Sequence, residues 1–142
     1  MTRSKPPTHS QNIRFIEYEL PGRWRVLVGR TERDNDYLSL KVARANDWWF
    51  HIRGMSGSHV VLKVPAGEDP PRETLKTAAS IAAYYSKARE AGVVAVSCTR
   101  AQYVTKPRGA KPGTVQIRKE SVLKVRPGLG DAVIADSEDE DN

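Results

Sequence analysis

The sequence predicts an α+β fold in which a largely antiparallel sheet carries one principal helix. Short segments that alternate apolar and polar residues, the pattern of half-buried strands, occupy the chain on both sides of a single long helical pattern. Strands grouped before and after one helix favour an antiparallel sheet, because a parallel sheet requires strands and helices in alternation. With 142 residues, of which 39% are hydrophobic, the chain is large enough for one domain with one core.

The first part of the chain is expected to form a tail and then five strands. Residues 1–11 are polar and contain Pro6 and Pro7, so we expect a disordered basic tail. The segments that follow are rich in aromatic and β-branched residues at alternate positions, and turn-forming residues such as Pro21 and Gly22 separate them. Strands are therefore expected at 12–20, 23–30, 35–42, 47–53 and 58–64.

One helix is expected at about residues 70–90. Asp69 can cap its first turn, Pro70 suits a first-turn position, and Gly92 lies where a helix would end. A face of mostly small residues at helical spacing should pack against the sheet, namely Leu75, Ala78, Ala79, Ala82 and Tyr85. A second stripe is expected to be solvated and consists of Lys76, Ser80, Tyr84 and Lys87.

Short strands and a basic loop are expected after the helix. In the loop 105–114, glycine and proline fix the course of the chain while Lys106, Arg108 and Lys111 project from it. Such a loop suits phosphate contacts, or it is simply a basic exposed turn. The strands are expected at 93–99, 102–105, 114–118 and 121–125. The domain is expected to span 12–128, and a disordered acidic tail to follow at 129–142.

The charge of the chain is unevenly placed. The net charge is +6, but the segment 131–142 holds six acidic residues and no basic one, which leaves 23 basic and 11 acidic residues, or +12, elsewhere. A body this basic attracts polyanions, most often nucleic acid, although the charge can also serve only solubility. The acidic segment is then a solubilising end, or it folds back and competes with nucleic acid.

The composition also indicates the cellular compartment of the protein. No apolar run approaches the roughly 18 to 20 residues that span a bilayer, and the N-terminus lacks the apolar stretch of a secretory signal. The single Cys98 fits a reducing compartment. We therefore expect a cytoplasmic protein, monomeric, without a cofactor and without membrane contact.

The stretch 47–63, DWWFHIRGMSGSHVVLK, gathers aromatic, imidazole and basic groups around a glycine-rich turn. Alternation in a strand assigns one set of side chains to the core and the other to the opposite face, with Trp48, Phe50 and Ile52 in the first set and Trp49, His51 and Arg53 in the second. Whether His51 and His59 share a side depends on the turn register, because a slip of one residue reverses every side chain. The sequence leaves that register open.

Several chemistries can be weighed for this stretch. A zinc site needs three or four ligands, and two histidines with a distant lone cysteine are too few. Nucleophilic catalysis by Ser58 with His59 is disfavoured, since adjacent strand residues point to opposite faces. Metal-independent RNA cleavage stays open, with His51 and His59 as acid and base and Lys41 or Arg53 stabilising the pentacovalent phosphorus. RNA binding, and a packed hairpin whose histidines satisfy backbone groups, also stay open.

Five motifs follow one another along the chain: VGR at 28–30, ND with LSLKVA at 35–43, NDWWFHIRGMSGSHVVLK at 46–63, AASIAAYYSKAR at 78–89 and KPRGAKPGTVQIR at 106–118. In this order and spacing they closely resemble the NFACT-R domain, the C-terminal RNA-binding module of the NFACT or fibronectin-binding protein A family. The resemblance runs from about Arg25 to Pro127. Each motif of the family is matched here: D-x-W-F-H by Asp47, Trp49, Phe50 and His51, G-S-H-V-V by 57–61, the helix motif by 82–87, and K-x-x-G-A-K-P-G by 106–113.

The resemblance implies RNA binding in ribosome-associated quality control and translation. Large members of the family bind the large ribosomal subunit with an obstructed nascent chain and its tRNA, and promote C-terminal tailing. Their other domains have no counterpart in this sequence, so we expect a standalone NFACT-R protein that binds rRNA or tRNA without catalysis, to which tailing does not simply transfer. An adaptor for a protein partner is a further alternative. The expected RNA-binding residues are Arg30, Lys41, Trp49, His51, Arg53, Ser58, His59, Lys63, Lys87, Arg89, Lys106, Arg108 and Lys111.

Overall fold

A computed structural model describes residues 15–135 and confirms the antiparallel α+β fold. Its main sheet has seven strands in the order β8-β5-β3-β4-β2-β1-β9, and every neighbouring pair is antiparallel. The strands are β1 (Phe15–Leu20), β2 (Trp24–Gly29), β3 (Trp48–Ile52), β4 (Val60–Leu62), β5 (Val94–Arg100), β8 (Ser121–Val125) and β9 (Val133–Ile134). A second, two-stranded sheet pairs β6 (Val104–Thr105) with β7 (Gln116–Ile117).

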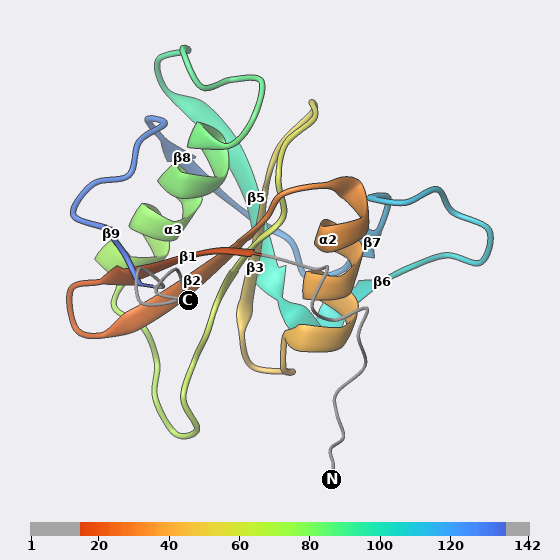
Figure 1. Cartoon of the computed structure of the whole chain (residues 1–142), viewed down its shortest axis with the longest axis horizontal. Helices are drawn as coiled ribbons and strands as arrows, with labels where there is room; N and C mark the ends of the chain where they lie inside the picture. The colour runs from red at the N-terminus through yellow and green to blue at the C-terminus, as the bar shows by residue number, and fades with distance from the viewer. Residues whose placement is uncertain (1–14, 136–142) are drawn as a thin grey trace, which may run out of the picture.

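The main sheet is covered on both faces, which gives the molecule two cores (Figure 1). Helix α3 (Arg72–Tyr84) packs on one face, where alternate residues such as Phe50 and Ile52 join its alanines in the larger core. The other face carries α2 (Glu32–Tyr37), the π-helical turn η1 (Leu38–Val42) and the β6–β7 sheet. Trp49 and Val61 belong to this smaller core, as alternation along β3 and β4 requires.

The strand predicted at 35–42 is wrong, because this segment is helical. Thr31 caps α2 by accepting a hydrogen bond from the Asp34 amide at 3.0 Å, and acidic residues occupy the first turn. The alternating apolar positions that suggested a strand, Leu38, Leu40 and Val42, all contact the smaller core from η1. A threonine followed three residues later by an acid was a usable helix-start signal.

Helix α3 is shorter than the predicted 70–90. It begins at Arg72 with Pro71 as its cap, and it ends at Tyr84. The backbone groups that follow the helix form hydrogen bonds with the turn after β3. The Ser58 amide donates to the Tyr85 carbonyl at 2.9 Å, and the Lys87 amide donates to the Ser56 carbonyl at 3.1 Å. The chain therefore leaves the helix at the point where the hairpin turn meets it. A short 3₁₀ turn, η2 (Ala101–Tyr103), follows β5.

The segment 129–135, near the end of the described residues, contains a strand. Residues 129–135, assigned to a disordered tail by the sequence, include β9, which pairs Tyr18 with Ile134 and Glu19 with Val133. Leu129 and Ala132 pack against the larger core, so apolar burial holds this segment. The predicted N-terminal tail 1–11 and the acidic residues 136–142 lie outside the described residues. Among the described helices, none has the length and apolar character that crossing a membrane demands.

Candidate nucleic-acid interface

The register of β3 and β4 brings the two histidines together. Phe50 pairs with Val60 and Trp49 with Val61, so His51 and His59 lie on the same side of the sheet with ring centroids 5.4 Å apart. The ring of Trp49 stacks beside His51 at 6.0 Å. The structure thus resolves a question that the sequence left open.

His59 belongs to a buried hydrogen-bond network. Its side chain is 2% exposed, and its Nδ1 lies 2.8 Å from the Ser39 hydroxyl oxygen. The indole nitrogen of Trp49 donates to that same oxygen at 2.9 Å, and an indole nitrogen can only donate. The Ser39 oxygen has two lone pairs, so besides accepting from Trp49 it either donates its own proton to His59 Nδ1 or accepts from Nδ1, according to the tautomer of His59. The network ties β3 and β4 to η1.

Burial keeps both imidazoles neutral. Burial, the largest cause, and the neighbouring His51 together lower the pKa of His59 to about 4, against the opposite effects of Asp36 and backbone groups. Burial also lowers the pKa of His51. A buried histidine with such a low pKa is not a proton donor to RNA at neutral pH. The close histidine pair therefore supports packing more than acid–base catalysis. Within residues 15–135 no three His, Cys, Asp or Glu side chains gather as metal ligands.

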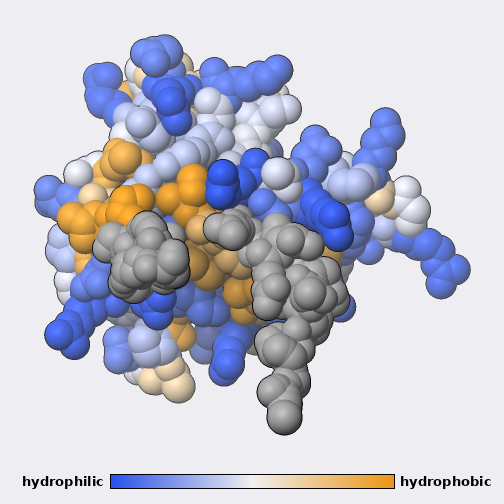
Figure 2. All heavy atoms as spheres, in the orientation of Figure 1, coloured by the Kyte–Doolittle hydropathy of each residue, from blue (hydrophilic) through white to orange (hydrophobic). Residues whose placement is uncertain are grey.

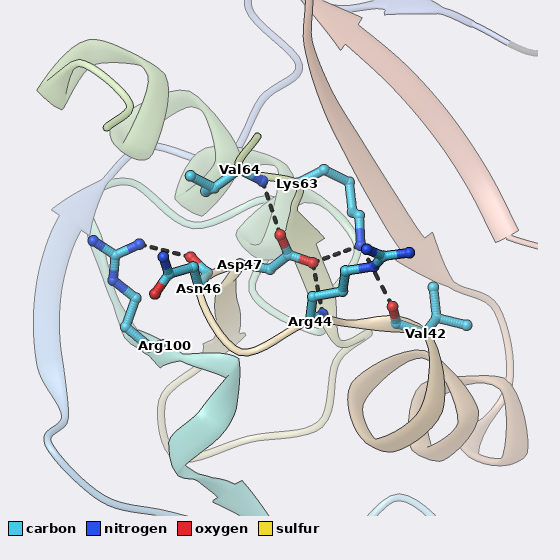
Figure 3. Close-up of polar contacts among 7 residues, drawn as sticks. All are labelled: Val42, Arg44, Asn46, Asp47, Lys63, Val64 and Arg100. Atoms are coloured by element: carbon cyan, nitrogen blue, oxygen red, sulfur yellow. Dashed lines mark hydrogen bonds and ion pairs between the residues drawn. The ribbon is translucent and has the colours of Figure 1, made fainter. Parts of the chain in front are cut away.

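The carboxylate of Asp47 anchors the chain before β3 (Figure 3). Asp47 is 2% exposed and accepts hydrogen bonds from the amides of Arg44 and Val64, each at 2.8 Å. Its third partner is the Lys63 ammonium, whose Nζ lies 2.5 Å from Oδ2. A buried carboxylate needs such partners, so Lys63, predicted to bind RNA, is engaged in the fold.

The basic loop between β6 and β7 is fastened at its base. Lys106 Nζ lies 3.1 Å from the Asp36 carboxylate and donates to the Lys111 carbonyl at 2.6 Å. The Gly113 amide donates to Asp36 at 3.0 Å. Arg108 and the Lys111 ammonium are left exposed toward the tip, and Figure 2 shows hydrophilic side chains on this projecting loop. Lys106 therefore shapes the loop, and the other two cations can meet a ligand.

A cavity of about 460 Å³ opens where the β3–β4 turn meets the end of α3 and the start of α2. Gly57 makes this meeting possible, because a Cβ there would lie 2.7 Å from Ser86 Cβ and 2.9 Å from a methyl carbon of Ile52. The exposed Arg30, Lys87 and Arg89 line the cavity together with one acid, Glu32. Its other lining residues are Thr31, Asn35, Ser56, Gly57, Ser58, Tyr84, Tyr85 and Ser86.

The cavity and the basic loop are neighbours. A Cβ at Gly113 would lie 3.1 Å from the side chain of Glu32, which also lines the cavity. The base of the loop that carries Arg108 and Lys111 thus packs against the start of α2, beside the cavity. We call the five residues Arg30, Lys87, Arg89, Arg108 and Lys111 the basic rim.

The remaining predicted residues lie elsewhere or are engaged. Trp49 is 3% exposed and His59 is 2% exposed, so neither ring can stack on a base at the surface. Arg53 Nε lies 3.2 Å from Glu120, and Lys41 is exposed at the end of η1. The prediction omitted Tyr84, Ser56 and Glu32, although Tyr84 stands in the helix motif and in the stripe expected to be solvated.

Comparisons with known proteins agree with this picture. The family model described as the NFACT protein RNA binding domain matches residues 14–119. The Rqc2 homolog RqcH of Bacillus subtilis is 40% identical over 110 residues, which cover 78% of this chain and 19% of that protein. The ribosome quality control complex subunit NEMF homolog of Drosophila melanogaster is 33% identical over 97 residues, 68% of this chain and 9% of that protein.

A solved structure is also similar. The C-terminal part of the fibronectin/fibrinogen-binding protein of Streptococcus suis superposes with a TM-score of 0.74 at 36% identity, covering 90% of this chain and 47% of that chain. The chain spans only about a fifth of the length of the RqcH proteins that it matches. Since the family model covers most of the chain, the protein belongs to the NFACT-R family of RNA-binding domains.

Proposed function

We propose that this protein binds structured RNA, rRNA or tRNA on the large ribosomal subunit, and serves ribosome-associated quality control. The basic rim is the observation that carries the proposal. Arg30 follows β2, and Lys87 and Arg89 follow α3; these three line one cavity, and the other two stand on the β6–β7 loop, whose base packs beside that cavity. None of the five side chains forms an ion pair with an acid of residues 15–135, so their charge is available to phosphates.

The relatives supply the cellular setting of the proposal. RqcH is named as a homolog of Rqc2, and the Drosophila relative is named as a subunit of the ribosome quality control complex. Both are much longer than the matched segment, so this chain is proposed to contribute RNA binding and no catalytic step. The burial of His59 supports RNA binding without catalysis, because it removes the imidazole from contact with a phosphodiester.

The test is sedimentation of the tagged protein in a cell lysate through a low-salt sucrose gradient. The variant Arg108→Glu/Lys111→Glu reverses two charges of the basic rim. Lys124→Glu/Arg126→Glu is the matched control, because these exposed residues lie on or just after β8, on the far side of the molecule from the loop (Figure 1). We expect the wild type and the control to sediment with the large subunit, and the rim variant to stay at the top.

Ribonuclease and salt sharpen the result. If about six phosphates are contacted, affinity should fall roughly a thousandfold between 50 and 200 mM salt. Sedimentation that survives ribonuclease and salt would favour a protein-adaptor role. A wild-type protein that remains at the top of the gradient at every salt concentration would overturn the ribosomal proposal. Incubation of the pure protein with labelled RNA tests cleavage directly, and intact RNA is the expected outcome.

A further inference from the structure

The cavity at the end of α3 has the lining of a site for one unpaired base. We infer that it receives a single unpaired nucleotide of the bound RNA, an inference that rests on the RNA binding proposed above. It is an open depression of about 460 Å³, a volume in the range of small-ligand sites. An unpaired nucleotide, at a strand end or a bulge, exposes the faces and edges that such a cavity can contact.

Tyr84 and Arg89 form a stacking platform in the cavity. The Arg89 guanidinium carbon lies 3.9 Å from the centroid of the Tyr84 ring. Arg89 Nε also donates to the Tyr84 carbonyl at 2.7 Å, which holds the guanidinium over the ring. Aromatic rings and guanidinium planes are the two side-chain surfaces on which unpaired RNA bases stack. Tyr85 packs edge-on against Tyr84 at 5.1 Å and fixes the orientation of the platform.

Polar groups for the sugar and phosphate surround the platform. Ser56 and Ser58 line the cavity, and their hydroxyls form no hydrogen bond with other residues of the described chain. The Ser86 hydroxyl differs, because it donates to the Ala83 carbonyl at 2.6 Å and accepts from the Ala88 amide. Arg30 and Lys87 add positive charge at the mouth. Stacking surface, open hydroxyls and cations thus converge on one nucleotide-sized space.

The inference predicts a preference between two RNAs that differ by one nucleotide. The first is a blunt duplex, and the second is the same duplex with a single 3′-overhanging 2-aminopurine. Stacking of one base changes affinity by roughly tenfold, so the wild type should bind the overhang duplex about tenfold more tightly. The fluorescence of 2-aminopurine should change on binding as the base enters the platform.

Variants separate the platform from the charge of the basic rim. Tyr84→Ala should lose most of the tenfold preference while still binding the blunt duplex, and Tyr84→Phe should keep the preference. Arg89→Gln should also lose most of the preference, and because it removes one charge of the basic rim it should weaken binding of both duplexes. Tyr103→Ala is the matched control, since Tyr103 is also half-buried with an arginine, Arg118, 5.5 Å above its ring, but lies outside the cavity. Because Arg89 is exposed, its replacement tests the platform even if Tyr84→Ala unfolds.

The outcomes distinguish this inference from the proposed function. Equal affinity of the wild type for both duplexes, or an unchanged 2-aminopurine signal, overturns the single-nucleotide site while RNA binding stands. Loss of preference in Tyr103→Ala to the same extent as in Tyr84→Ala also overturns it. Failure of the wild type to bind either duplex at low salt overturns RNA binding itself.

Discussion

The buried His59 makes the stability of this protein depend on pH in a calculable way. In the unfolded chain the pKa of a histidine is 6.5, and in the fold burial lowers that of His59 to about 4. Between these values the unfolded state binds the proton more tightly, so acid favours unfolding. The stabilisation is therefore complete above pH 6.5 and is lost as the pH falls toward 4.

The magnitude follows from the two pKa values. Lowering the pH from 8 to 5 should reduce the free energy of unfolding by about 2 kcal/mol through His59 alone, at 1.36 kcal/mol per unit. Burial also lowers the pKa of His51, which adds in the same direction. For a slope near 2 kcal/mol/M, the urea midpoint should fall by about 1 M.

The assay compares urea unfolding of the wild type and His59→Asn at pH 8 and pH 5. Asparagine keeps an amide group, with both an acceptor and a donor, near the position of Nδ1 for the Ser39 hydroxyl, but it does not titrate. The variant should be less stable at pH 8 and should lack about 2 kcal/mol of the pH dependence. All other titrating groups are common to both proteins. Equal pH dependence in the two would refute the neutral, buried state of His59.

Three further substitutions test the fold and the interface. Lys63→Met leaves the buried Asp47 carboxylate without its cation, so thermal unfolding should show a loss of about 3 kcal/mol; unchanged stability would contradict a structural role for this ion pair. Gly57→Ala forces a Cβ against Ser86 and should destabilise by about 1 to 3 kcal/mol in urea unfolding, whereas a neutral effect would mean that the turn relaxes freely. Glu32→Gln removes the one acid lining the cavity and should tighten RNA binding a few-fold in anisotropy titrations; weaker binding would place the RNA elsewhere.

Local patterns in the sequence predicted most strands because each has one face against a core. Trp48, Phe50 and Ile52 alternate toward α3, and that period of two is visible without a structure. The same rule failed at 35–42, since Leu38, Leu40 and Val42 contact the smaller core from a helical turn. Apolar periodicity reports burial, and a short segment can satisfy it in more than one conformation.

The sequence by itself determined the fold class, the basic character of the body and the family. Only the tertiary structure decided which of its cations are engaged in the fold and which remain exposed. Lys63 pairs with Asp47, sixteen residues earlier, and Lys106 with Asp36, seventy residues earlier, whereas Arg108 and Lys111 on the same loop remain exposed. It also placed Tyr84 beside the Gly57 turn, which made a cavity from segments far apart in the chain. Hydrogen bonds and ion pairs between distant segments leave no periodic trace in a sequence, because they depend on which elements the whole fold brings into contact.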